Sequence, residues 1–298
     1  GEVLCMVSAP SFDPEYKPSD IDTDTSGKYE GIYLNRFLSG VFTPGSTFKV
    51  VTAICALENI PNVNKRTFTC TGKYKIGKSE VTCNGVHGKV SFERALNVSC
   101  NSVFAELAAE LGSEKLTQTV KQLGFDKSVT VSLAKTAKSY FDVSGSSKLD
   151  LGWAGIGQYT TLVNPCQMLM LAGAIANNGQ AVTPYVVEES SRIFETKGQI
   201  NKNIKLSEET AKKVRKLMRS DVENYYGDYR FPDMKFCGKT GSAEGEGKKS
   251  HAWFYGFSNR NDFPYAIVVC LENGGIGLND AVPAAGKVMG AIADKYLK

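Results

Sequence analysis

Near its start the chain carries two residues that could act together in catalysis, Ser46 and Lys49. Pro44 and Gly45 predict a turn just before them, and apolar residues repeat at helical spacing just after them. Residues three positions apart share one face of a helix. A serine hydroxyl becomes an effective nucleophile when a base lies within hydrogen-bond reach, and a lysine becomes such a base when burial and cationic neighbours lower its pKa. The spacing therefore predicts a serine nucleophile with a lysine base at a helix start, where free N–H groups suit an oxyanion.

An isolated serine-x-x-lysine also fits a helix cap followed by a solvated lysine, so the interpretation depends on companion residues. The first companion is Ser99-Cys100-Asn101, which precedes a second run of apolar residues at helical spacing. Ser99 and Asn101 then lie at the start of a helix. Ser99 would relay a proton between Lys49 and a leaving amine, and Asn101 would bind a substrate amide. The structural alternative for Ser99 is a simple N-cap.

The second companion is Lys239-Thr240-Gly241-Ser242, which comes just before two strand-like runs. An edge strand with this sequence would pair with the backbone of an extended substrate. Lys239 supplies positive charge, the Thr240 and Ser242 hydroxyls would hold a carboxylate, and Gly241 would let a substrate approach closely. The alternative is a polar strand end before a turn.

Cys70 and Cys83 flank a short polar segment, and His87 follows closely. The two thiols are compatible with a disulfide, with free thiols, or with a metal site that includes His87. Two thiols and one imidazole give three ligands, and the sequence indicates no fourth. The chain's other cysteines lie in apolar or motif segments, where free cysteine behaves as a small hydrophobe.

Composition narrows the class of protein. The 298 residues are 42% hydrophobic and 22% charged, with a net charge of +4, which is typical of a globular chain. No basic run with interleaved aromatics indicates nucleic-acid binding, and no stretch has the roughly 20 apolar residues of a membrane span. No signal peptide is evident, and the chain opens in a strand-like segment, so we expect a single domain over 1–298 that lacks an upstream part.

Periodicity and turn residues predict the elements that position these motifs. The predicted elements are strands at 2–9, 251–257 and 265–271, a polar loop at 10–31, a hairpin within 71–82, a turn at 155–158, and helices at 103–111, 113–125, 164–177, 207–218 and 284–297. Gly112 is the expected stop of the first of these helices.

Together the three motifs form the S-x-x-K, S-x-N and K-T-G set of the penicillin-recognising serine enzymes. The chain resembles the transpeptidase domain of penicillin-binding proteins, most closely the class B, monofunctional kind. Further matching segments are 8–14, 35–36, 155–158 with 164–165, 239–244 and 254–257. The resemblance implies an α+β fold: a central antiparallel sheet with helices on both faces, the terminal strands and final helix on one side, and an all-helical subdomain on the other.

The resemblance also implies D,D-transpeptidation of peptidoglycan stem peptides that end in D-Ala-D-Ala. Ser46 would be the nucleophile and Lys49 the base, and Ser99 and Lys239 would manage leaving-group protonation and charge. The backbone N–H groups of Ser46 and Ser242 would form the oxyanion hole. β-Lactam antibiotics, as mimics of the substrate end, would acylate Ser46.

Two positions depart from the family pattern. Ser242 stands where threonine is common, with its hydroxyl retained. Cys100 fills the variable position of S-x-N and would be reactive if exposed.

No cofactor and no nucleic acid is expected. The implied setting is the extracytoplasmic face of the bacterial cell membrane, where the full-length protein would carry an upstream membrane anchor and meet cell-wall synthesis proteins. Three other interpretations of the function remain open. They are a class D-like serine β-lactamase, which shares Ser-Thr-Phe-Lys but lacks S-x-N, a β-lactam-sensing receptor domain, and a D,D-carboxypeptidase.

Overall fold

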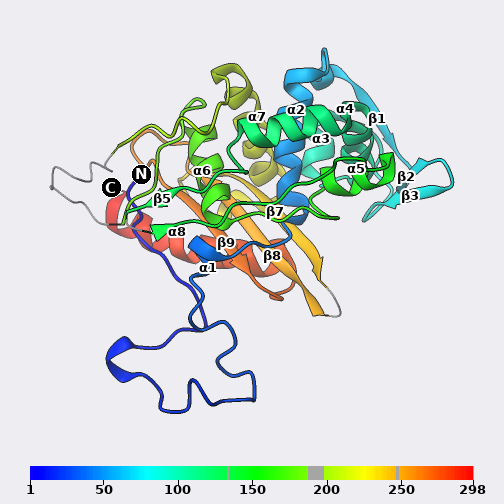
Figure 1. The fold of residues 1–298 in the computed structure, drawn as a ribbon. Helices are drawn as coiled ribbons and strands as arrows, with labels where there is room; N and C mark the ends of the chain where they lie inside the picture. Colours follow the sequence, from blue (N-terminus) through cyan, green and yellow to red (C-terminus); the bar gives the residue numbers. More distant parts are fainter. Residues whose placement is uncertain (133, 187–197, 246–247, 298) are drawn as a thin grey trace.

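An antiparallel sheet forms the centre of the molecule (Figure 1). The structure is a computed structural model that describes residues 1–132, 134–186, 198–245 and 248–297. In this described part the sheet has the strand order β7-β8-β9, with β7 at Cys237–Gly245, β8 at Lys248–Phe257 and β9 at Ala266–Leu271. Thr240 is paired with Phe254 across the first strand pair. The predicted strands at 251–257 and 265–271 and the placement of the K-T-G motif on an edge strand are confirmed.

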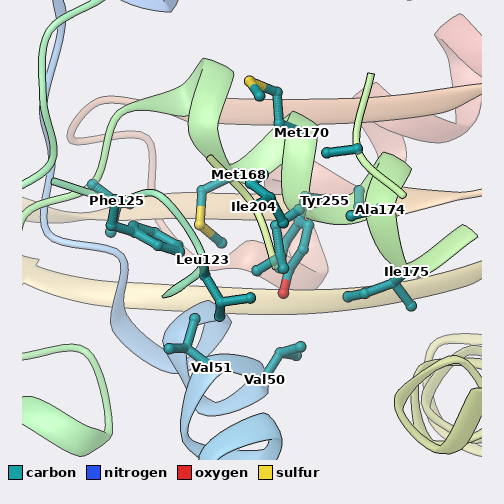
Figure 2. Close-up of a cluster of buried hydrophobic side chains, with 14 of the residues drawn as sticks. Val50, Val51, Leu123, Phe125, Met168, Met170, Ala174, Ile175, Ile204 and Tyr255 are labelled. Atoms are coloured by element: carbon teal, nitrogen blue, oxygen red, sulfur yellow. The ribbon is translucent and has the colours of Figure 1, made fainter. Parts of the chain in front are cut away.

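The sheet separates two hydrophobic clusters because successive side chains of a strand point to opposite faces. On β8, Phe254 packs into a cluster with Val282 and Met289 of helix α8 (Val282–Tyr296). Trp253 and Tyr255 face the other way, into a cluster dominated by helix α6 (Pro165–Ala176) and part of α2 (Lys49–Asn59). Figure 2 shows this second cluster, where Val50 and Val51 of α2 lie below Met168 and Tyr255. Helices on both faces confirm the α+β class.

A third cluster forms the helical subdomain around the opposite side of α2. Ala53, Cys55 and Ala56 of α2 pack there against α4 (Asn101–Gln122). Most of α2 is therefore buried, on every face, between two clusters. Gly112 adopts a positive φ of 78° and kinks α4, so the expected helix stop is a bend between two helical segments.

The remaining elements connect these layers. They include the 3₁₀ turn η2 at Gly45–Phe48 and the helices α1 at Arg36–Ser39, α3 at Phe92–Asn97, α5 at Lys148–Gly155 and α7 at Glu208–Asp221. They also include three antiparallel strand pairs: β1/β4 at Thr67–Cys70 and Gly88–Ser91, β2/β3 at Lys73–Ile76 and Ser79–Thr82, and β5/β6 at Thr130–Val131 and Ala134–Lys135. The predicted hairpin within 71–82 is the β2/β3 pair, and the predicted helices at 164–177, 207–218 and 284–297 are α6, α7 and α8. Among the described residues, no helix has the length and apolar character to cross a bilayer.

The predicted strand at 2–9 is wrong. Only Glu2 makes a β-bridge, to Tyr185, and most side chains of the segment are exposed. The segment is held instead by side-chain contacts: the Ser8 hydroxyl donates to the Leu34 carbonyl (2.8 Å) and accepts the Arg36 N–H (3.0 Å). The apolar run from Val3 to Val7 favours a strand only where other elements cover it, and Leu4 and Val7 are exposed here. The sheet consequently lacks the N-terminal strand that the resemblance implies.

The side chain of Asn164 joins the start of helix α6 to the segment around α1. Its carboxamide Oδ1 caps α6 at the Gln167 N–H, and its Nδ2 donates to the carbonyls of Leu38 (3.0 Å) and Gly40 (2.8 Å). The side chain is almost fully buried. Asn164→Ala is expected to lower the free energy of unfolding by about 2–4 kcal/mol, because a cap is lost and buried carbonyls lose their donor.

Urea unfolding measures this loss. Asn177→Ala is the matched control, because its Nδ2 makes an exposed contact with the Gln180 carbonyl. It should cost less than about 0.5 kcal/mol. Equal losses in the two variants would contradict the assignment.

Candidate active site

A tight turn presents Ser46 in front of the first buried helix. Ser46 lies in η2, and α2 begins at Lys49, so the serine precedes the α-helix and does not belong to its first turn. Gly45 has a positive φ of 53°, and its N–H donates to the Gly157 carbonyl (2.9 Å). A Cβ on Gly157 would lie 2.1 Å from the Gly45 carbonyl oxygen. The predicted turn at 155–158 therefore supports the turn that carries Ser46.

The Lys49 amine is the centre of the site. Its Nζ lies 2.9 Å from Ser46 Oγ, 3.1 Å from Ser99 Oγ, 2.6 Å from the Ser99 carbonyl oxygen and 2.6 Å from Asn101 Oδ1. The side chain is fully buried. Burial, and then the positive charge of Lys239, lower the pKa of Lys49 to about 7. A lysine in this state can accept a proton from the serine at neutral pH.

Ser99 and Asn101 converge on Lys49 from the junction of two helices. Ser99 follows α3 with a positive φ of 52°, a costly conformation for a non-glycine residue, and Asn101 is the first residue of α4. Asn101 Nδ2 donates to the Thr82 carbonyl (3.0 Å) while Oδ1 accepts from Lys49. Both ends of the carboxamide are thus engaged within the protein. In this structure Asn101 positions Lys49, and its role in binding a substrate amide stays a prediction.

Lys239 completes the cationic part of the site. Its fully buried Nζ is 3.4 Å from Ser99 Oγ and donates to the Tyr226 hydroxyl oxygen at 3.1 Å. The same oxygen accepts a hydrogen bond from Thr240 Oγ1 (3.1 Å). Tyr226 was not predicted from the sequence. It ends a short π-helical turn after α7, and nothing in its local pattern separates it from a core tyrosine.

Gly241 packs closely against the turn that carries Ser46. A Cβ at this position would lie 2.5 Å from the Pro44 carbonyl oxygen and 2.9 Å from Thr47 Cγ2. The missing side chain is required for packing of the Ser46 turn onto β7, and the role of Gly241 in admitting substrate stays a prediction. Ser242 is exposed, and its Oγ accepts the Gly277 N–H at 3.0 Å. Gly45 packs against the Ser242 carbonyl, which brings the Ser46 and Ser242 backbones together.

A buried acid, Asp221, lies behind the two lysines. It is fully buried at the end of α7, and neither carboxylate oxygen has a hydrogen-bond partner among the described residues. Burial raises the pKa of Asp221 to about 7, against the opposing effect of the Lys239 and Lys49 charges. Asp221 was not predicted from the sequence, because an aspartate at a helix end ordinarily faces solvent.

The sulfur and imidazole ligands considered from the sequence also come together. Cys70, Cys83 and His87 lie in one group with Cys100, and the four ligand atoms are all within 4.8 Å of one another. The four residues include the variable position of S-x-N. Each of the three cysteines is a free thiol, and Cys100 is buried, so it is not the exposed reactive thiol considered above.

Comparisons with known proteins identify the family of this chain. The family model described as the penicillin-binding protein transpeptidase domain matches residues 1–297. Stage V sporulation protein D of Bacillus subtilis is 30% identical over 97% of this chain, which spans about half (47%) of that relative. The D,D-transpeptidase domain of a peptidoglycan glycosyltransferase from Eggerthella lenta has a TM-score of 0.83 at 26% identity, covering 97% of this chain and 74% of that one.

Penicillin-binding protein A of M. tuberculosis, solved as a ceftriaxone acyl-enzyme complex, has a TM-score of 0.82 at 24% identity over 98% of this chain and 71% of that chain. The chain belongs to the penicillin-binding protein transpeptidase domain family.

The buried charges predict how the site responds to pH. Acylation by a β-lactam should rise with pH through a midpoint near 7, because Lys49 must be neutral to accept the Ser46 proton. An ionised Asp221 favours the charged form of Lys49. Asp221→Asn removes that anion, destabilises the ammonium and should shift the midpoint to lower pH by up to about one unit.

The measurement is the pH profile of the second-order acylation rate. Asp126→Asn is the control, because Asp126 also has a buried oxygen without a partner among the described residues but is not among the charges that act on Lys49. A midpoint that moves to higher pH in the Asp221 variant, or moves equally in both, would refute this electrostatic coupling.

Proposed function

We propose that the chain is a peptidoglycan D,D-transpeptidase domain that cross-links stem peptides through an acyl-enzyme on Ser46. The observation that carries the proposal is the contact of one buried amine, Lys49 Nζ, with Ser46 Oγ, Ser99 Oγ and Asn101 Oδ1. A serine with a neutral lysine base and a second serine on the same amine suits acyl transfer. The names of its relatives support the same reaction.

In the first half-reaction, Lys49 Nζ accepts the Ser46 proton while Ser46 Oγ bonds to the carbonyl carbon of the penultimate D-Ala. The Ser46 and Ser242 backbone N–H groups would stabilise the oxyanion. The bond to the terminal D-Ala nitrogen then breaks. Ser99 Oγ gives its proton to that leaving amine and regains one from Lys49, which is possible because the two groups are 3.1 Å apart.

In the second half-reaction, an amine of another stem peptide attacks the acyl-enzyme. Its proton passes through Ser99 to Lys49, and Ser46 leaves with a proton from Lys49. Lys239 Nζ lies beside Ser99 Oγ, at 3.4 Å. Every proton taken in the first half-reaction is thus returned.

The substrate carboxylate would bind at β7. Lys239 supplies charge, and the hydroxyls of Thr240 and Ser242 supply donors. Tyr226 orders two of these groups, because its hydroxyl accepts hydrogen bonds from Lys239 and Thr240. The edge position of β7 leaves one side of the strand for backbone pairing with an extended peptide.

This substrate sets the place of action. Peptidoglycan lies outside the cytoplasmic membrane, so the proposed reaction requires the extracytoplasmic face, and membrane-anchored cell-wall synthesis proteins are the partners that it implies.

Intact mass spectrometry after incubation with penicillin G tests the nucleophile and the reaction class. The wild type should gain the mass of one intact penicillin and keep it for at least many minutes, because the family resemblance implies slow release by water. Ser46→Ala should gain none. An adduct that persists in Ser46→Ala would overturn the nucleophile assignment.

Ser258→Ala is the control, since Ser258 is a buried serine just after β8 whose Oγ donates to the Met234 carbonyl at 3.0 Å. It should acylate like the wild type. Rapid release of hydrolysed penicillin would instead indicate a β-lactamase. Release of D-Ala from a stem peptide by water alone, with no cross-linked product when an acceptor amine is present, would indicate a carboxypeptidase.

A further inference from the structure

Beside the proposed active site, four potential metal ligands meet from separate parts of the chain. Cys70 ends β1, Cys83 follows β3, His87 precedes β4, and Cys100 is the N-cap residue of α4. Their ligand atoms all lie within 4.8 Å of one another. The sequence supplied the first three, and the fold supplies the fourth from the S-x-N motif.

Two distances between ligand atoms of this group match a tetrahedral metal site. Zinc–sulfur bonds of about 2.3 Å and zinc–nitrogen bonds of about 2.0–2.1 Å give tetrahedral edges of about 3.8 Å between two sulfurs and about 3.6 Å between sulfur and nitrogen. Cys83 Sγ lies 3.8 Å from Cys100 Sγ and 3.6 Å from His87 Nδ1. Two edges of the tetrahedron are therefore formed already.

The donor set and its burial favour a structural zinc ion. Three thiolates with one imidazole are a common structural zinc set, and soft sulfur donors select against magnesium and calcium. Cys70 and Cys100 are buried, whereas Cys83 and His87 are partly exposed and leave a path for the ion. A disulfide between two of the cysteines would leave the third thiol and the histidine without a role.

The surroundings also suit metal-bound thiolates. Cys83 Sγ accepts the Asn101 backbone N–H at 3.2 Å, and Cys70 Sγ is 3.4 Å from Ser102 Oγ. Such outer hydrogen bonds orient ligands and stabilise the negative charge of bound sulfur. Asn101 and Ser102 both lie in the first turn of α4, so the cluster and the catalytic motif share one segment.

We propose that Cys70, Cys83, His87 and Cys100 bind one zinc ion, which fixes the S-x-N segment against the β2/β3 hairpin. Cys100 lies between Ser99 and Asn101 in the chain, so a bond from zinc to its sulfur restrains both neighbours. Asn101 is further held to Thr82 at the end of β3 (3.0 Å). The metal thereby maintains the placement of Asn101 Oδ1 on Lys49, and this second step rests on the proposed function, whereas metal binding does not.

Metal analysis of the protein purified without chelators under reducing conditions tests the site. We expect about one zinc per chain in the wild type and less than about 0.2 in Cys83→Ser and His87→Ala, because each loses a ligand. Cys270→Ser is the matched control, a partly buried cysteine on β9 outside the cluster, and should keep its zinc. Cobalt added to metal-free protein should give thiolate charge-transfer bands and the d–d bands of a tetrahedral site.

Three results with the wild-type protein would overturn the proposed zinc site. They are a failure of the metal-free wild type to take up zinc or cobalt, iron in place of zinc, or an intact mass lowered by the two hydrogens of a Cys83–Cys100 disulfide in the protein as purified. Zinc that remains in both ligand variants would also refute the assignment.

A second measurement separates the metal from the catalytic proposal. Removing zinc from the wild type should slow penicillin acylation about tenfold or more and lower its Tm, with recovery of both on adding zinc. Zinc binding with unchanged acylation would refute only the link to S-x-N. Absence of acylation in the zinc-loaded protein would refute the proposed function and leave the metal site standing.

Discussion

The buried amine of Lys49 is the contact on which the site depends. It joins the Ser46 turn to the α3–α4 junction through hydrogen bonds to Ser46, Ser99 and Asn101. A charged ammonium in this environment loses its hydration, and the chain compensates with four oxygen contacts. The nucleophile and the S-x-N motif come from different segments, and one amine holds them in register. The third motif enters through Lys239, which reaches the same Ser99 hydroxyl.

Lys49, Lys239 and Asp221 are all fully buried, and this burial determines the electrostatics of the site. Lys239 lowers the pKa of Lys49, while Asp221 acts in the opposite direction. Burial raises the pKa of Asp221 itself to about 7. Lys49 and Asp221 thus both have a pKa near 7 and both lie near Lys239. A change in the charge of either one shifts the pKa of the other.

Local patterns in the sequence were enough for the motifs and most of the helices. Ser46 and Lys49 were identified by their three-residue spacing before an apolar run at helical spacing. Helices α6 and α7 were identified by their N-cap residues and apolar spacing. Helix α5 was missed, although Ser147 and Asp150 form a capping box at its start, because its short apolar face gives little periodicity.

The features that the sequence did not predict depend on long-range packing. Gly241 packs against a turn that comes from nearly two hundred residues earlier, a contact that no local pattern around Gly241 could predict. The fourth sulfur of the cysteine group and the burial of Asp221 depend likewise on segments that meet only in the folded chain. The predicted strand at 2–9 was wrong for a related reason, because an apolar run does not reveal whether other elements cover it in the folded chain.

Helix α2 belongs to both large clusters that flank the active site. Val50, Val51 and Ile54 pack with α6 and the sheet, whereas Ala53 and Ala56 pack with α4. Neither cluster can open without exposing a face of this helix. The two halves of the domain should therefore unfold as one cooperative unit, and the amide hydrogens of α2 should exchange with solvent only when the whole domain opens.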